Sequence, residues 1–408
     1  MDDLHGDLRG IIEHLDHVQN LGIDVLYMTP IFKSNSSHKY DTIDYYQIDP
    51  SFGTTEDLRE LVQEAHKRGM KIVMDAVFNH TGREFFAFED IMEKGEKSKY
   101  LDWYYIEKFP LKSERGEIPN YKCFGYYGGM PKLNLKNPEV EKFITDVACY
   151  WIKECNIDGW RMDVGDEISH YFWKNFRRAV KAVKKDMLII GEIWHYAGDF
   201  LEGDEWDTVM NYPFYLNLID LLADEKINVS QFIQNLGYLK GRLNKKCYPL
   251  MWNLIDSHDT ARFLHLCKDN KKKQHLAAAF QLLLPGMPMI YYGDEFAMPG
   301  ANDPDCRRGM YWDEEYQDKE MFEWYKQLLK VRKNHACIVE GEPLEIAARD
   351  GEETIVLTRK NDEETLALIF NCSSSARMFN EYAQKYDLLR ENPFDGKIEG
   401  LDAAVIVL

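Results

Sequence analysis

The sequence predicts an α/β protein: a (β/α)8 TIM barrel that lacks its first strand, with an inserted domain after strand three and a C-terminal antiparallel β domain. Three observations carry this prediction. Short apolar strands alternate with amphipathic helices along most of the 408 residues, which predicts a parallel sheet covered by helices. The strands are short and the helices are regular, which favours a barrel over an open doubly wound sheet. From about Cys337 onward the pattern becomes strand, turn, strand, as in an antiparallel sheet.

The expected elements follow from apolar spacing and from capping residues. Helix 8–21 has apolar residues at helical spacing, and Gly22 stands where its C-terminal cap would lie. Helix 55–68 has Thr54 or Thr55 as its N-cap. The remaining barrel helices are expected at residues 138–154, 167–185, 229–243, 272–284 and 321–334. The apolar runs between the helices predict strands at residues 23–30, 71–78, 157–164, 187–194, 208–213, 250–257 and 288–294.

This series contains seven barrel strands, because the chain begins at the helix that should follow strand one. We therefore expect the sequence to be part of a longer protein whose upstream residues supply that strand. A stretch rich in Gly, Lys and Tyr with weak periodicity interrupts the alternation after the third strand. The expected organisation is a barrel formed by residues 1–80 and 138–336, an inserted domain at 81–137, and a C-terminal β-sandwich domain at 337–408 with strands at 353–359, 365–371 and 403–408.

Composition excludes several classes of function. Lys and Arg number 50 against 69 Asp and Glu, a net charge of −19, which disfavours nucleic acid and anionic membranes as partners. No G-x-G-x-x-G or P-loop motif occurs, so nucleotide binding is not indicated. The eight cysteines form no C-x-x-C pair, which indicates reduced thiols rather than a zinc site. No signal peptide or membrane-spanning run is visible, so we expect a cytoplasmic protein.

Polar residues emerge from the apolar runs at the strand ends, where barrels carry their chemistry. Each has a structural alternative: a strand-end cap, a salt bridge between residues two apart, a surface carboxylate or a turn. Four such groups at four strand ends favour a site. Three carboxylates with an arginine and two histidines indicate glycoside hydrolysis, which needs a nucleophile and an acid, whereas H-x-H and H-E-x-x-H metal motifs are absent. The residues are Asp75, His80, Arg161, Asp163, Glu192, His258 and Asp259.

The motifs DAVFNH (75–80), GWRMDV (159–164), GEIW (191–194) and SHD (257–259) resemble the four conserved regions of the alpha-amylase family, in the usual order. MPKLN (130–134), HKYDTIDYYQIDP (38–50) and GANDPDCRRGMYWDE (300–314) are similar to the neopullulanase, cyclomaltodextrinase and maltogenic amylase subfamily. The similarity covers residues 5–335, and the ordered set of motifs is highly specific.

The resemblance implies a role for each matching residue. Asp163 would be the nucleophile, Glu192 the general acid/base and Asp259 the third carboxylate, which holds the 2- and 3-hydroxyls of the sugar. Arg161 would keep Asp163 ionised, and Asp75 would support the floor of the site through Arg161 and His80. The implied substrate contacts are a stacking Tyr40, hydroxyl contacts from His80 and His258, a subsite −2 pair Asp303 and Arg307, and Trp194 on the acceptor side.

The resemblance therefore implies a retaining α-glucan hydrolase that cleaves α-1,4 bonds of maltodextrins, cyclodextrins or pullulan, and it leaves cleavage of α-1,6 bonds open. Two alternatives stay open: a glycosyltransferring relative, and a catalytically inactive interaction protein on the same scaffold. The chain has Gly165-Asp166-Glu167 where relatives commonly have Ala-Asn-Glu, which adds a charge near Asp163. No metal ligand and no cofactor is predicted, and a calcium ion is not supported by this sequence. The oligomeric state is open, because the N-terminal dimerisation domain of relatives is absent.

Overall fold

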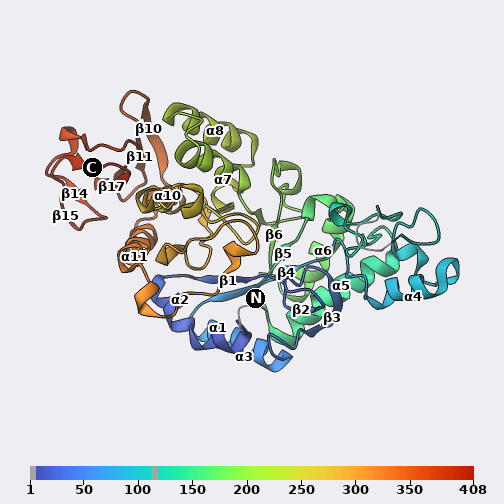
Figure 1. Cartoon of the computed structure of the whole chain (residues 1–408). Coiled ribbons are helices and arrows are strands. Elements are labelled where there is room, and N and C mark those ends of the chain that lie inside the picture. Colours follow the sequence, from blue (N-terminus) through green and yellow to red (C-terminus); the bar gives the residue numbers. More distant parts are fainter. Residues whose placement is uncertain (1–5, 113–117) are drawn as a thin grey trace. The chain divides into compact units, whose positions relative to one another are not determined.

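The computed structural model describes residues 6–112 and 118–408, and these form two compact units (Figure 1). The first unit extends to Ile193 and includes Asp199–Val209, and the second comprises Trp194–Gly198 and Met210–Leu408. The predicted start of the barrel domain at residue 1 and residues 113–117 of the predicted insertion lie outside the described residues. The domain boundaries proposed from the sequence remain predictions.

The first unit contains a five-stranded parallel sheet in the order β1-β4-β5-β6-β7. Each strand pairs with the next one of this series, as expected when helical connections return the chain to one edge. The register places Asp75 opposite Arg161 and Met162 opposite Gly191. The strands are β1 (Val25–Met28), β4 (Lys71–Ala76), β5 (Gly159–Met162), β6 (Leu188–Gly191) and β7 (Thr208–Val209).

The helices of this unit begin at capping residues that satisfy their first N–H groups. Thr54 and Asp57 form a capping box at α3, and Asn137 caps α5 just before a proline. The helix expected at 8–21 is two helices, because His14 leaves helical geometry, whereas Gly22 ends the second with a φ of 100° as expected. The helices are α1 (Leu8–Glu13), α2 (Leu15–Leu21), α3 (Thr55–Lys67), α4 (Phe86–Lys94), α5 (Pro138–Cys155) and α6 (His170–Val183).

Two regions of the first unit contain elements that the sequence analysis did not predict. Strands β2 (Phe32–Ser34) and β3 (Thr42–Ile48) form an antiparallel pair after β1. Within the predicted insertion, α4 is followed by short 3-10 helices, and single bridges join His80 to Lys132 and Tyr104 to Leu133. The bridge at His80 brings the end of this region back to the residues that follow β4.

In the second unit, two of the predicted strands are much shorter than expected. The apolar runs 250–257 and 288–294 pair only over β8 (Trp252–Asn253) and β9 (Met287–Pro288). The chain leaves extended geometry at Gly293, whose φ is 88°. The helices are α7 (Tyr212–Leu218), its π-helical continuation (Ile219–Ala223), α8 (Val229–Arg242), α9 (Phe263–Leu266), α10 (Lys271–Leu283), α11 (Lys319–Asn334) and α12 (Cys337–Glu340).

The C-terminal residues form the predicted antiparallel sheet, in the order β10-β11-β12-β17-β14-β15. Its core includes Val356, Ile369, Phe394 and Ile406. Strand β10 was not predicted, because most of its side chains are exposed and give no apolar alternation. The strands are β10 (Glu342–Arg349), β11 (Thr354–Lys360), β12 (Thr365–Asn371), β14 (Tyr386–Asp387), β15 (Asn392–Pro393) and β17 (Asp402–Val407), with β13 (Arg377–Met378) paired to β16 (Lys397–Ile398). Among the described residues, no helix is long and apolar enough to cross a membrane.

Candidate active site

In the first unit, the ends of three adjacent strands bring together four of the predicted site residues. Arg161 Nη1 donates to both oxygens of Asp75, at 3.2 and 3.0 Å, and to Asp163 Oδ1 at 2.9 Å. Its Nη2 lies 3.1 Å from Glu192 Oε2. Asp75 is the penultimate residue of β4, Asp163 follows β5 and Glu192 follows β6. All four residues are buried, so one guanidinium contacts three carboxylates that have little access to water and offsets only part of their charge.

Two tyrosines complete the surroundings of Asp75. Tyr27 Oη donates to Asp75 Oδ2 at 2.5 Å, and Tyr40 Oη donates to the same oxygen at 3.2 Å. Burial raises the pKa of Asp75 to about 6, against the opposing effects of Arg161 and the Tyr27 hydroxyl. Sequence analysis missed Tyr27, although a hydroxyl at the end of an otherwise apolar strand was a usable signal, because such a group needs a partner.

The charge of Arg161 is secured by its neighbours. Burial alone would lower its pKa, but the carboxylates of Asp75 and Glu192 hold that pKa well above its ordinary value. The predicted role of Asp75, to support the floor of the site through Arg161 and His80, remains a prediction, and among the described contacts Asp75 bonds Arg161 but not His80. Asp75 is held by Arg161, Tyr27 and Tyr40.

The backbone after Asp163 is strained where it contacts Glu192. Val164 has a φ of 47°, a region that β-branched residues rarely adopt and that costs about 1–3 kcal/mol. In this conformation the N–H of Val164 donates to Glu192 Oε2 at 2.8 Å. The strained residue therefore fixes the Glu192 carboxylate, and strain of this kind concentrates at functional sites.

His80 is held by the protein in one tautomer. Its Nε2 lies 3.0 Å from the carbonyl oxygen of Tyr40, which can only accept, so Nε2 carries the proton. Its Nδ1 lies 3.4 Å from Asn79 Nδ2, which can donate. Beyond Asn79 lies a pair that sequence analysis did not assign: Lys132 Nζ bonds Asn79 Oδ1 at 2.6 Å and Glu167 Oε2 at 2.7 Å. Lys132 belongs to the MPKLN motif and Glu167 to the divergent Gly165-Asp166-Glu167 segment, so each had a sequence signal.

The burial of His80 predicts a pH dependence of stability. Burial lowers the pKa of His80 to about 4, from 6.5. Between these values the unfolded chain binds a proton that the folded chain does not, so the contribution of His80 to stability is lost as pH falls from 6.5 towards 4. Between pH 7 and pH 4.5, the free energy of unfolding in urea should fall by about 2 kcal/mol less in His80→Gln than in the parent chain. Parallel pH curves for the two proteins would contradict a buried, neutral His80.

In the second unit, Arg307 joins the other predicted residues. Its Nε donates to the carbonyl oxygen of His258 at 2.8 Å and lies 3.1 Å from Asp303 Oδ1. Its Nη2 lies 3.5 Å from Asp259 Oδ1, and His258 Nε2 lies 3.1 Å from Asp259 Oδ2. Trp194 lies elsewhere in this unit, where its ring stacks on Tyr212 at 3.8 Å.

A buried arginine that sequence analysis did not assign fixes the segment that carries these residues. Arg262 donates to the carbonyl oxygens of Cys306 at 3.2 Å and Tyr292 at 2.8 Å, and it lies 3.3 Å from Asp294 Oδ1. Burial raises the pKa of Asp294 well above its ordinary value, with Asp256 as a further cause. Through its contact with the Cys306 carbonyl oxygen, Arg262 holds the backbone one residue before Arg307.

Within residues 6–112 and 118–408, no group of three or more His, Cys, Asp or Glu side chains is arranged to hold a metal ion. The predicted site residues of each unit supply carboxylates, an arginine and hydrogen-bonding side chains. In the first unit, two carboxylates beside one buried guanidinium suit acid, base or nucleophilic steps.

Comparisons with known proteins agree with these features. The family described as "Alpha amylase, catalytic domain" matches residues 1–316. Neopullulanase 2 of Thermoactinomyces vulgaris is 48% identical over 338 residues, which cover 82% of this chain and 57% of that protein. The intracellular maltogenic amylase of Bacillus subtilis is 43% identical over 367 residues, which cover 90% of this chain and 62% of that protein. The chain thus spans less than two thirds of the length of these curated relatives.

A solved structure of a cyclomaltodextrinase is similar with a TM-score of 0.93 at 39% identity, covering 98% of this chain and 71% of that one. These comparisons confirm the fold class expected from the sequence, a (β/α)8 barrel with a C-terminal antiparallel β domain, and the resemblance to the neopullulanase, cyclomaltodextrinase and maltogenic amylase subfamily. The chain belongs to the alpha-amylase family and contains its catalytic domain.

Proposed function

We propose that the protein is a retaining α-glucan hydrolase that cleaves α-1,4 glucosidic bonds of maltodextrins, cyclodextrins or pullulan, and cleavage of α-1,6 bonds stays open. The observation that carries this proposal is the single guanidinium of Arg161, which contacts Asp75, Asp163 and Glu192 at the ends of three adjacent strands. It keeps a nucleophile and an acid/base close together in a buried setting. Similarity to enzymes named cyclomaltodextrinase, neopullulanase and maltogenic amylase supports the substrate class.

The proposed reaction has two displacement steps. Asp163 attacks the anomeric carbon, while Glu192 gives its proton to the departing glycosidic oxygen. The resulting glucosyl ester on Asp163 is then attacked by water, whose proton returns to Glu192. The contacts from Val164 N–H and Arg161 stabilise the anionic Glu192 that serves as base in this second step. Asp75, Tyr27 and Tyr40 hold the guanidinium that orients Asp163.

The remaining residues are proposed to bind the sugar. Tyr40 would stack beneath the ring in subsite −1, and His80 would share its Nε2–H between the Tyr40 carbonyl and a sugar hydroxyl. In the second unit, Asp259 and His258 would bind sugar hydroxyls, and their contacts with each other and with Arg307 support a fixed orientation. Arg307 and Asp303 would bind the glucose in subsite −2. We propose a cytoplasmic location, supported by the relative named as an intracellular enzyme.

The stereochemistry of the first product tests the mechanism. Retention predicts that the sugar released from maltotriose appears first as the α-anomer, because two inversions at the anomeric carbon restore its configuration. Proton NMR of the anomeric region during the first minutes of reaction measures this, before mutarotation mixes the anomers. A β-anomer as first product would contradict a nucleophilic Asp163, and products longer than the substrate would favour the glycosyltransferring alternative. The absence of any turnover of maltotriose, β-cyclodextrin and pullulan would favour the inactive interaction protein.

A further inference from the structure

The indole ring of Trp206 packs against two glycines next to the candidate acid/base. Gly191 ends β6 directly before Glu192, and Gly165 follows Val164, whose N–H donates to Glu192 Oε2. A Cβ atom at Gly191 would lie 2.1 Å from the Trp206 ring, and a Cβ atom at Gly165 would lie 2.7 Å from it. Neither approach is sterically possible, so the ring lies directly against the backbone of both glycines.

Aromatic neighbours hold the Trp206 ring in place. The residue is 1% exposed, and its ring stacks on Phe200 with centroids 4.1 Å apart and an interplanar angle of 8°. The ring of Trp173 lies edge-on at 5.8 Å, and Trp173 Nε1 donates to the carbonyl oxygen of Gly165 at 2.9 Å. All of these residues belong to the first unit. The ring and the backbone that it contacts therefore have little freedom to move apart.

The size of the ring, rather than its N–H group, accounts for an indole at this position. Among the described residues, no acceptor bonds the buried Trp206 Nε1, and an unmade hydrogen bond of this kind destabilises the folded chain. A phenyl ring would avoid that cost but would reach less far. The atoms that approach Gly191 and Gly165 all belong to the six-membered part of the indole.

The backbone of Gly165 does not itself require glycine. Its φ is not positive, so an alanine at this position would be free of backbone strain. Apart from the Trp206 ring, the nearest atom to an added Cβ is Met162 Cβ at 3.4 Å, an ordinary contact. The Trp206 ring is therefore what excludes a methyl group at this position.

We propose that Trp206 is a positioning residue for the acid function of Glu192. Its ring fixes Gly191, which precedes Glu192, and Gly165, which continues the turn whose Val164 N–H binds the Glu192 carboxylate. A shift of either segment moves that carboxylate away from the departing oxygen, and a displacement of about 1 Å can lower a rate on the order of 10²-fold. The inference rests on the proposed function and adds a residue that touches no substrate.

Two substrates with different leaving groups separate loss of the acid from general damage. Maltotriose needs a proton on its departing oxygen, whereas α-maltosyl fluoride releases fluoride ion with little need for a proton. Gly165→Ala, which pushes against the Trp206 ring, should lower kcat/KM for maltotriose about 10²-fold and kcat/KM for α-maltosyl fluoride by no more than about threefold. Equal losses on the two substrates, or no loss on either, would overturn the proposal.

A double variant tests whether the ring causes the loss. Trp206→Phe leaves room for a methyl group, so Gly165→Ala combined with Trp206→Phe should exceed Gly165→Ala alone by at least about tenfold in kcat/KM for maltotriose. Urea unfolding should show a parallel recovery of stability. If Gly165→Ala does not fold, Trp206→Phe alone provides the comparison of substrates, with the same unequal losses expected. A double variant no better than Gly165→Ala would overturn the proposal.

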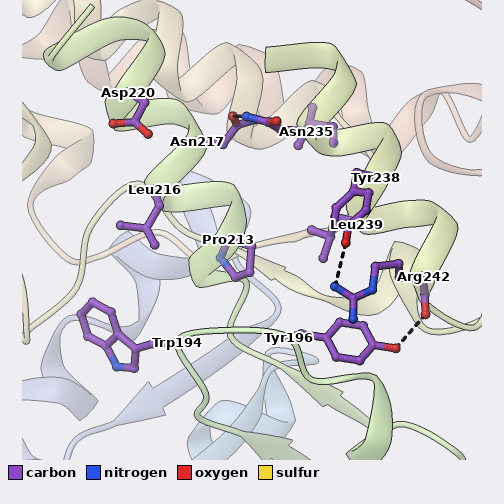
Figure 2. Close-up of a pocket in the computed structure, with 11 residues that line it drawn as sticks. Trp194, Tyr196, Pro213, Leu216, Asn217, Asp220, Asn235, Tyr238, Leu239 and Arg242 are labelled. Carbon is purple, nitrogen blue, oxygen red and sulfur yellow. Dashed lines mark hydrogen bonds between the residues drawn. The ribbon is translucent and has the colours of Figure 1, made fainter. Parts of the chain in front are cut away.

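Gly237→Ala is the matched control for an added methyl group. Gly237 lies on α8 of the second unit, next to Tyr238 of the pocket of about 360 Å³ shown in Figure 2, and a Cβ atom there would meet nothing within 4 Å. This variant should keep kcat/KM for both substrates within about twofold of the parent. A parent chain that turns over neither substrate would overturn the proposed function and this inference together. An active parent with equal losses in Gly165→Ala would overturn the inference alone.

Discussion

Replacing Asp163 by Asn is expected to lower kcat on maltotriose by at least about 10⁴-fold, the scale seen when a catalytic nucleophile is removed. The amide keeps the shape of the carboxylate but cannot form the glucosyl ester. Arg161 keeps its contacts with Asp75 and Glu192, so the guanidinium is still neutralised. The fold should therefore survive, and the loss should lie in kcat, because the variant still has every proposed substrate contact except the nucleophile.

The matched control is Asp166→Asn, which removes the charge of an exposed carboxylate three residues along the chain. It should change kcat by no more than about threefold, since exposed charges interact weakly across water. Initial rates for both variants, with urea unfolding of each, give the comparison. A fully folded Asp163→Asn protein with more than a hundredth of parental kcat would exclude Asp163 as nucleophile. A large loss of kcat in Asp166→Asn would show that removing any nearby negative charge lowers kcat.

Much of this arrangement was predictable because parallel strands end at one edge of their sheet. Asp75, Asp163 and Glu192 each follow an apolar run, so strand pairing alone brings them together. The ion pair of Arg161 with Asp163 follows from residues two apart on one strand. In the same way, Arg307 and Asp303 contact each other because they are four residues apart.

Contacts between residues distant in sequence were not predictable. Tyr27 meets Asp75 across 48 residues, and Lys132 meets Glu167 across 35, so each depends on register and loop path. The strained φ of Val164 depends on the turn after β5, which no local propensity favours for a valine. The strands predicted at 250–257 and 288–294 were too long for another reason. An apolar run indicates that its residues are buried, and buried residues need not pair in a sheet.

The environment of Arg161 determines what its loss should cost. Its side chain has 0% exposure, and it contacts three carboxylates with side-chain exposures of 0, 7 and 9%. Buried carboxylates without a counter-charge repel one another and cannot be solvated. Removing the guanidinium therefore leaves charges that the folded chain can tolerate only by taking up protons or by rearranging.

Arg161→Met should accordingly lower the free energy of unfolding by about 3–5 kcal/mol. It should also lower kcat on the order of 10²-fold or more, because the carboxylates are no longer held in position. Arg161→Lys restores the charge but lacks the planar fork that reaches Asp75, Asp163 and Glu192 together. It should recover most of the stability and little of the activity. Urea unfolding and kcat on maltotriose, measured for both variants, separate the two effects. If Arg161→Met were as stable as the parent and kept a tenth of its kcat, the shared guanidinium would not organise the site.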